Sequence, residues 1–368
     1  MKPRILIVGG GIAGLSTAWG LARRGFAVEL FEQGPLPNPA SSSHDEHRII
    51  RHAYGEMQGY AHLIVQAFAV WERLWAALGR RHYLETGSLN LLRYDAPWYE
   101  ATRVSLAALG IGFRDIPLDR VAATRPMLNL DGVQRAVETD GAGMLFPVRI
   151  VTDLVVLLGR LGVCLHAGAK VSAVDPVRGT LAASGRLHEG DAVVVAAGAW
   201  ADRLVPSLKG VGVPSRQAVL YLAPPPDLAE AWATAPVMID MAEDGDVYCL
   251  PPRDGMRLKI GDHVFSRRGD PDGDRVATEA DLARLWTAAR ACYRDLDRYA
   301  VLEPKACFYT VTQDECFIVR PLDAKGWLIS ACSGHGFKFG ALMGEGVAQA
   351  IAGERDPAGV EAWAAGLT

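Results

Sequence analysis

The sequence of 368 residues predicts an α/β fold, and three observations support this class. An apolar run at residues 4–8 precedes a glycine-rich turn and a helical pattern, which is typical of a buried parallel strand followed by a helix. A second apolar run at residues 192–197 has the same character. Residues 217–262 contain short segments that alternate like sheet strands. Since domains contain roughly 150 residues each, the length predicts two domains or one large composite fold.

Composition and charge exclude several classes of protein. Half of the residues are apolar and 22% are charged, which excludes a disordered or collagen-like chain. The formal net charge of −4 offers little overall attraction to phosphates, so no nucleic-acid partner is expected. The uncharged stretch Ile5–Ala22 resembles a signal peptide or a short membrane span, but four glycines between residues 9 and 14 interrupt it. The six cysteines include no Cys-x-x-Cys pair, which disfavours zinc-ribbon and thioredoxin chemistry, and no metal site is expected. With no export signal and no other apolar stretch long enough to cross a bilayer, we expect a cytoplasmic protein without a membrane segment, as a monomer or weak oligomer.

The first 32 residues predict a βαβ unit. Arg4–Val8 is a short apolar run with β-branched residues, which indicates a fully buried strand. Ile12–Arg24 has helical spacing and ends at Gly25, a residue that commonly stops helices. Ala27–Phe31 predicts the second strand, which ends at Glu32. The unit is therefore about 30 residues long, the usual size for this motif.

Further elements follow along the chain, after a loop rich in Pro, Asn and Ser at residues 34–43. Trp71 and Trp75 lie one helical turn apart and are predicted to pack in the core. Helices are predicted at residues 61–78, 147–162 and 280–293, and from about residue 336 onward. Strands are predicted near residues 83–92, 192–197, 217–223, 246–251, 256–262, 307–319 and 327–330.

The turn at residues 9–14 reads Gly-Gly-Gly-Ile-Ala-Gly and fits the G-x-G-x-x-G pattern. One glycine makes the turn, one lets the backbone approach a pyrophosphate, and one lets helix and strand pack closely. Glu32 lies 18 residues beyond Gly14, close to the ~20 expected for an acid that accepts ribose hydroxyls and repels a 2′-phosphate, which disfavours NADP. The pattern predicts a Rossmann-like dinucleotide site and leaves NAD and FAD open. Its candidate contacts are Gly9, Gly11, Ile12, Ala13, Gly14 and Glu32.

The later run at residues 193–200 reads V-V-V-A-A-G-A-W and helps to choose between the two cofactors. In FAD-dependent oxidoreductases a strand that ends in this way commonly returns to the cofactor in the middle of the chain. The run therefore favours FAD and makes Gly198 and Trp200 candidate contacts. A plain core strand is the alternative interpretation of the same pattern.

Four later blocks carry a more specific resemblance. They read R-I-I-R-H-A-Y-G-E at residues 48–56, L-K-I-G-D-H at 258–263, K-A-C-F-Y-T-V-T-Q-D-E at 305–315 and S-G-H-G-F-K at 333–338. In this order they resemble the amine-oxidising flavoproteins of the D-amino-acid-oxidase superfamily, and most of all the branch of monomeric sarcosine oxidase and N-methyltryptophan oxidase. We expect a discontinuous Rossmann-like FAD-binding domain and a substrate domain with a mostly antiparallel sheet. The FAD-binding domain is expected at residues 1–80, 145–215 and 305–368, and the substrate domain at 81–144 and 216–304.

Two arginines three positions apart, Arg48 and Arg51, form the first candidate site. An arginine fork can hold a carboxylate through two parallel hydrogen bonds, although alone this stretch also fits a solvated basic segment. The resemblance implies that Arg51 clamps the substrate carboxylate together with Lys338. It places Arg48 beside the flavin ring, where positive charge stabilises the reduced, anionic flavin.

Lys259 lies in the alternating run R-L-K-I-G, where an outward-facing lysine is the more common outcome. The resemblance instead implies that Lys259 faces the flavin and hosts oxygen activation. A cation there stabilises the superoxide that forms when the first electron reaches O₂. His263, Tyr248 and Tyr309 match positions that line the substrate pocket, and ordinary packing is the alternative for all three.

Cys307 is the candidate for covalent attachment of the cofactor. A single buried cysteine is usually a small hydrophobic residue. The resemblance implies a bond from its sulfur to the flavin 8α-methyl group, which would prevent loss of the cofactor and raise its potential. Backbone N–H groups near the flavin pyrimidine are expected to stabilise negative charge. The remaining candidate FAD contacts are Gly334, Gly336, Phe337, Lys338, Ser42, Ser43 and Val171.

The chain departs from this pattern at three places. Asp45-Glu46-His47 occupies positions where related sequences often carry Gly-Asp-Thr. Cys316 occupies a position where they often carry His, and Cys332 one where an aromatic residue is frequent. Because of these changes, the sequence does not identify the amine substrate. We predict an FAD-dependent oxidase of a secondary or N-methyl amino acid that uses O₂ and releases an imine and hydrogen peroxide, with no evident catalytic base. The alternatives are a cyclic imino-acid oxidase of pipecolate or proline type, a flavin amine dehydrogenase, and a flavin subunit that needs a partner.

Overall fold

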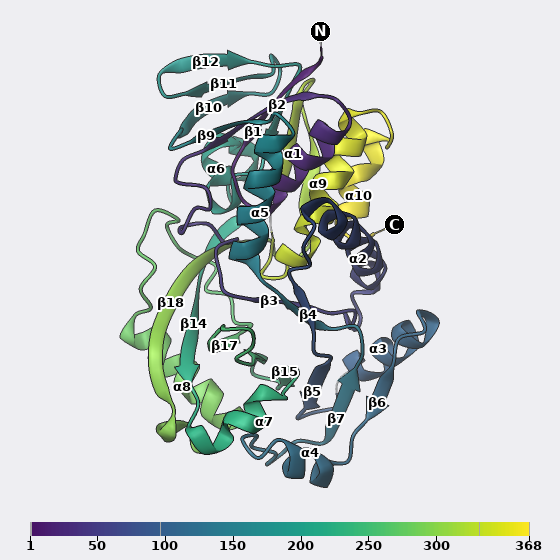
Figure 1. The fold of residues 1–368 in the computed structure, drawn as a ribbon, viewed down its shortest axis with the longest axis vertical. Helices are drawn as coiled ribbons and strands as arrows, with labels where there is room; N and C mark the ends of the chain where they lie inside the picture. The colour runs from purple at the N-terminus through teal and green to yellow at the C-terminus, as the bar shows by residue number, and fades with distance from the viewer. Residues whose placement is uncertain (1, 96, 331, 368) are drawn as a thin grey trace.

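The computed structural model describes residues 2–95, 97–330 and 332–367, and its first large sheet joins segments from both ends of the chain (Figure 1). The strand order is β19-β20-β13-β1-β2-β9. All neighbouring pairs are parallel except β19 and β20, as expected for a doubly covered α/β sheet. The strands are β1 (Arg4–Val8), β2 (Ala27–Glu32), β9 (Cys164–Ala167), β13 (Ala192–Val195), β19 (Ile318–Leu322) and β20 (Gly326–Ser330).

Helices α1 and α9 pack closely against each other, because glycines at their contact let the backbones approach. A Cβ atom on Gly344 of α9 would lie 2.6 Å from the backbone nitrogen of Thr17, and one on Gly20 of α1 would lie 2.7 Å from Cβ of Ala348. Glu345 pairs with Arg23 and Arg24 at 2.8 and 2.9 Å across the same contact. The helices of this half are α1 (Ile12–Arg23), α2 (Gln58–Leu78), α5 (Pro147–Arg160), α6 (Ala201–Leu204), α9 (Phe337–Ile351) and α10 (Val360–Ala364).

The second large sheet is mostly antiparallel, with the order β18-β14-β17-β16-β15-β5-β7-β6 and one parallel pair, β15 with β5. Its long strands β14 and β18 are paired from Val213 and Val311 to Ala223 and Ala300, and in Figure 1 they run down from the first sheet. The strands are β5 (Ser88–Leu92), β6 (Phe113–Asp115), β7 (Arg135–Thr139), β14 (Val213–Ala223), β15 (Val237–Met241), β16 (Val247–Leu250), β17 (Leu258–Asp262) and β18 (Ala300–Val311). The helices around it are α3 (Pro97–Ala108), α4 (Leu118–Thr124), α7 (Ala229–Ala233) and α8 (Glu279–Cys292).

Two small sheets complete the fold. The first has the order β3-β8-β4 and carries Arg48 on its first strand. The second has the order β10-β11-β12. Their strands are β3 (Arg48–Ile50), β4 (Tyr83–Glu85), β8 (Gly143–Leu145), β10 (Val171–Asp175), β11 (Thr180–Ala183) and β12 (Arg186–Glu189).

The α/β class and the mostly antiparallel second sheet agree with the sequence prediction. Trp71 and Trp75 are buried and their rings stack at 5.0 Å, which confirms the core prediction. The single strand region predicted at residues 307–319 is wrong in extent, because β18 begins at Ala300 and a turn separates it from β19. The first three residues of β18 are exposed, so they leave no burial pattern in the sequence. The domain division stays a prediction. Within the described residues, no helix is both long and apolar enough to cross a membrane.

Candidate active site

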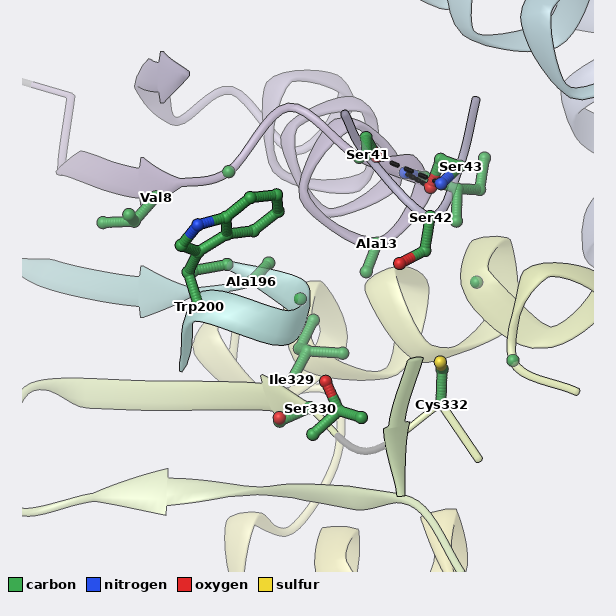
Figure 2. Close-up of a pocket in the computed structure, with 18 of the residues that line it drawn as sticks. Val8, Ala13, Ser41, Ser42, Ser43, Ala196, Trp200, Ile329, Ser330 and Cys332 are labelled. Atoms are coloured by element: carbon green, nitrogen blue, oxygen red, sulfur yellow. Dashed lines mark hydrogen bonds between the residues drawn. The ribbon is translucent and has the colours of Figure 1, made fainter. Parts of the chain in front are cut away.

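A cavity of about 430 Å³ lies at the carboxyl ends of β1 and β13, the place where open α/β sheets bind ligands. In Figure 2, Ala13 and Ser42 lie on one side of it, and Ile329 and Cys332 on the other. The candidate cofactor contacts that line it are Gly9, Gly11, Ile12, Ala13, Glu32, Ser42, Ser43, Arg48, Val171, Gly198, Trp200, Gly334, Gly336 and Phe337. Three other candidates, Gly14, Cys307 and Lys338, are not among its lining residues.

The glycine turn fits the close approach of a pyrophosphate. Gly9 has a φ of +106°, and a Cβ atom on it would collide with the carbonyl of Ala196. A Cβ atom on Gly14 would collide with the carbonyl of Gly9, so Gly14 shapes the turn although it does not line the cavity. Helix α1 begins at Ile12, whose N–H donates to Oγ of Ser43 at 3.0 Å. The start of α1 therefore lies at the cavity wall, where its dipole favours phosphate.

Glu32, the candidate ribose acid, is held in place by three donors. Its Oε2 accepts from the N–H of Gly10 at 2.8 Å. Its Oε1 accepts from the N–H of Gly34 at 2.9 Å and from Nδ2 of Asn38 at 2.8 Å. Each carboxylate oxygen has two lone pairs, so the group retains capacity for ribose hydroxyls. The sequence prediction did not identify Asn38, a loop residue whose side chain enters the site through its hydrogen bond to Glu32.

A second cavity of about 150 Å³ adjoins the first. Arg48, Tyr309, Gly334 and Phe337 line both cavities, so the two meet at these residues. All seven side chains predicted to act in catalysis line the smaller cavity, namely Arg48, Arg51, Tyr248, Lys259, His263, Tyr309 and Lys338. The fold thus gathers residues from four distant sequence blocks around one small space.

Arg51 and Lys338 form a pair of buried cations in the smaller cavity. Arg51 donates from Nη1 to the carbonyl of Ala53 at 2.6 Å. The Arg51 guanidinium and Nζ of Lys338 lie 5.5 and 5.2 Å from the ring centre of Tyr54. Burial lowers the pKa of Arg51, and burial followed by the charge of Arg51 lowers that of Lys338 well below its usual value. No ion pair from either cation to a carboxylate exists among the described residues, so the pair is suited to bind an anionic ligand.

Lys259 is fully buried, with 0% of its surface exposed, because both faces of β17 are covered. The alternation that suggests an outward-facing lysine is therefore misleading here. Its Nζ donates to Oδ2 of Asp45 at 2.6 Å and to the carbonyl of His47 at 3.3 Å. Burial, followed by the positive charge of Arg48, lowers the pKa of Lys259 to about 8.

Asp45 was not among the candidate residues, although it lies at the centre of this arrangement. Its Oδ2 also pairs with Nη1 of Arg48, and its Oδ1 accepts from the hydroxyl of Tyr221. Burial alone would raise the pKa of Asp45, but Arg48 and Lys259 hold it well below its usual range. A departure from the related sequences was the only signal that pointed to this position.

The remaining candidate side chains differ in their positions. Tyr309 is 9% exposed, and burial raises the pKa values of Tyr309 and Tyr248, which keeps both phenols neutral. His263 is at the rim, with its side chain 43% exposed and Nε2 lying 3.1 Å from Oε2 of Glu315. Asp246 lines the same cavity and was missed from sequence, and burial raises the pKa of its carboxyl group.

Cys307 lies beside the cavities without lining either one. It is two residues before Tyr309 on β18, so both side chains point to the same face of the sheet. Burial raises the pKa of the Cys307 thiol, and the charge of Arg48 opposes this effect. Cys332 is a second thiol in this region and lines the larger cavity.

Three potential metal ligands lie together on β2 and β9. The ligand atoms of Glu29, Cys164 and His166 are within 4.8 Å of one another. The carboxylate of Glu29 already pairs with Arg4 at 2.6 Å and lies 3.1 Å from Nε2 of His166. Its charge is thus compensated within the protein, and none of the three residues lines either cavity.

Comparisons with known proteins agree with this fold. N-methyl-L-tryptophan oxidase of Yersinia pestis (strain Pestoides F) is 24% identical over 357 residues, which cover 93% of this chain and 92% of the relative. L-proline dehydrogenase from P. horikoshii superposes with a TM-score of 0.82 at 20% identity, covering 97% of this chain and 95% of the other. NikD, an amino acid oxidase of nikkomycin biosynthesis, gives a TM-score of 0.78 at 19% identity, with coverages of 95% and 94%. The sequence profile of the family described as FAD dependent oxidoreductase matches residues 4–350, and the chain therefore belongs to this family, as its sequence blocks predict.

Proposed function

We propose that the protein oxidises a secondary or N-methyl amino acid to an imine, with O₂ as the electron acceptor and hydrogen peroxide as a product. The supporting observation is the gathering of all seven candidate side chains around a cavity of about 150 Å³ that adjoins the candidate FAD cavity. Its volume suits a small amino acid. When bound, FAD supplies the two-electron acceptor for the carbon–nitrogen bond of the substrate.

The cations of the smaller cavity orient the substrate and favour its reactive protonation state. Arg51 and Lys338 hold the carboxylate, which turns the amine toward the junction of the two cavities. Arg48 adds positive charge at that junction, and Lys259 adds it in the smaller cavity. Nearby cations lower the pKa of a bound ammonium group, so the amine is held in the neutral form that can be oxidised. The imine then hydrolyses in water, and an N-methyl substrate gives formaldehyde.

A panel of amines with a peroxide readout tests the proposal. We expect peroxide release with sarcosine-like or cyclic secondary amino acids, and none with the corresponding amides, which lack the carboxylate. Reduction of an artificial dye without peroxide would favour a dehydrogenase. This second candidate is supported by Asp45, whose negative charge contacts the lysine proposed for the oxygen reaction. Inertness toward both O₂ and dyes would contradict the oxidase and favour the partner-dependent subunit.

Replacing Arg51 with alanine should weaken binding of carboxylate ligands by roughly 10- to 100-fold, because hydrogen bonds to charged groups contribute about 1.5–3 kcal/mol. The change should raise KM, or the inhibition constant of a simple carboxylate such as propionate. Arg51 forms no ion pair among the described residues, so its removal breaks no such contact and should preserve the fold, and the pKa of Asp246 should rise because the charge of Arg51 lowers it. The control is an uncharged amide analogue, whose affinity should change little. Unchanged carboxylate affinity in Arg51→Ala would remove Arg51 from the site.

A further inference from the structure

Asp45 is a buried carboxylate placed between two cations that line the smaller cavity. It is 4% exposed, and its Oδ2 contacts both Nζ of Lys259, at 2.6 Å, and Nη1 of Arg48. Its other oxygen accepts from the hydroxyl of Tyr221 and from the N–H of Glu46, the latter at 2.8 Å. All four hydrogen-bond partners thus hold the group in its ionised form.

Asp45 reaches the reacting centre only through its two cations. Arg48 and Lys259 line the smaller cavity, whereas Asp45 is absent from the described lining of both cavities. It is therefore a positioning residue and does not contact the substrate. Its segment, residues 45–47, is one of the places where the sequence departs from the resemblance.

The other groups that face Lys259 are uncharged near neutral pH. Burial, and then Lys259 itself, lowers the pKa of His47 to about 3, so this imidazole is neutral. Burial raises the pKa values of Tyr221 on β14 and Cys307 on β18, so both keep their protons. Asp45 and Arg48 are thus the charged neighbours that determine the state of the lysine.

We propose that Asp45 sets the charge at the oxygen site in two opposing ways: it holds Lys259 protonated, and it cancels part of the positive field of Lys259 and Arg48. The inference rests on the proposed function, in which Lys259 provides the cation for oxygen reduction. A cation at this place favours electron transfer to O₂, and a carboxylate beside it opposes that transfer. The reduced protein therefore reacts with oxygen more slowly than it would with an uncompensated pair of cations. Because Lys259 stays protonated to a higher pH, however, the reaction with oxygen also persists to a higher pH.

The sign of the pH dependence follows from the two effects. Lys259 carries its charge below its pKa of about 8 and loses it above that pH, so the rate of oxygen reaction should fall as the pH rises through about 8. Removing the Asp45 charge lowers the pKa of Lys259 further, by about one to three units, because an opposite charge in contact favours the charged form. The same change strengthens the positive field wherever Lys259 is still protonated.

The test is to compare Asp45→Asn with the wild type as flavin-loaded enzymes between pH 5 and 9. Reduced by substrate and mixed with O₂, the variant should react about tenfold faster at pH 5, the effect of removing one unit charge roughly 12 Å from the developing charge at an effective dielectric constant of about 20. Its rate should fall at a pH at least about one unit lower, so the two profiles should cross. A purely structural role would lower the rate at every pH without moving the profile, and that result would overturn the proposal.

Two further measurements do not depend on turnover. The absorption spectrum of the oxidised enzyme should change as Lys259 loses its proton, because the charge of Lys259 acts on the flavin. The midpoint pH of this change should be lower in the variant than in the wild type, by the same amount as the rate profile. Affinity for sulfite, an anion that binds oxidised flavoproteins, should rise about tenfold in Asp45→Asn at pH 5. If the wild type accepts electrons from substrate but never passes them to O₂, the oxidase proposal fails, and these measurements still decide the role of Asp45.

Matched variants separate local charge from general destabilisation. Asp240→Asn removes another carboxylate that is 4% exposed and paired with an arginine, Arg93 at 2.6 Å, and it should lower stability without moving the pH profile. Should Asp45→Asn not fold, Tyr221→Phe provides a milder change of opposite sign. Losing the hydroxyl leaves more negative charge on Asp45, so the profile should move to higher pH. An unmoved profile and spectrum in Tyr221→Phe would then contradict the proposal.

Discussion

Replacing Lys259 with methionine is expected to slow the reaction of the reduced enzyme with oxygen by about 10²- to 10³-fold, the size typical for removal of one group that stabilises a developing anion. Reduction of the enzyme by substrate should change by no more than about threefold, because the carboxylate is held by Arg51 and Lys338. Asp45 keeps Arg48 and Tyr221 as partners in this variant, so no carboxylate is left unpaired. Stopped-flow absorbance of the flavin, followed first with substrate without oxygen and then with oxygen, measures the two steps separately.

The exposed lysine Lys209 provides the control for this substitution. Lys209→Met makes the same chemical change outside both cavities and should leave both steps unchanged. Equal slowing of the two steps in Lys259→Met would contradict the role assigned to Lys259. A selective loss of the oxygen step would also give a function to this buried ammonium, since burying an ion pair such as that of Lys259 and Asp45 is costly in itself.

Replacing Cys307 with serine is expected to convert a cofactor that survives acid precipitation into one that is released completely. The wild-type pellet should stay yellow, because a thioether bond resists denaturation, and the pellet of Cys307→Ser should be white with its colour in the supernatant. The position of Cys307 on the same strand face as Tyr309, which lines both cavities, supports this expectation. Absorbance of the supernatant and the mass of the intact protein give the measurement.

Cys332→Ser is the matched control, because Cys332 is the cysteine that lines the larger cavity directly. Its pellet should remain yellow. A white wild-type pellet would reject covalent attachment altogether, whereas release from Cys332→Ser alone would move the attachment to that residue. The three outcomes are distinct, so one set of pellets identifies the bond.

The elements predicted well from sequence are those with a strong local signal. The βαβ unit of residues 4–32 has an apolar strand, a glycine turn and a helix stop, and β1 and β2 match their predicted positions. Helix α3 gave no such signal, since only Thr102 and Leu106 of it are buried. Short strands such as β3 and β8, which pair with each other across about ninety residues, depend on partners elsewhere in the chain, and single-sequence patterns carry little information about such pairing.

The candidate site shows the same division between local and distant information. Motifs identified all seven catalytic candidates in the smaller cavity, but other lining residues such as Asp246 were missed and contacts between distant segments remained hidden. Lys259 and Asp45 are 214 residues apart, and no spacing rule links them. The ring of donors around Glu32 was also missed, because Asn38 lies in a loop whose path the sequence does not define. Sequence patterns thus identified many of the reactive side chains, but only the fold shows which of them form hydrogen bonds or ion pairs with one another.

The seam between α1 and α9 has a consequence for how the protein receives its ligands. One helix starts at the glycine turn and the other at Phe337, which lines both cavities. Because bare backbone and paired charges hold the two helices together, their starting residues Ile12 and Phe337 keep a fixed separation in the wall of the larger cavity. A ligand therefore meets a rigid wall on this side of the cavity, and any movement that admits it must come from other segments of the lining.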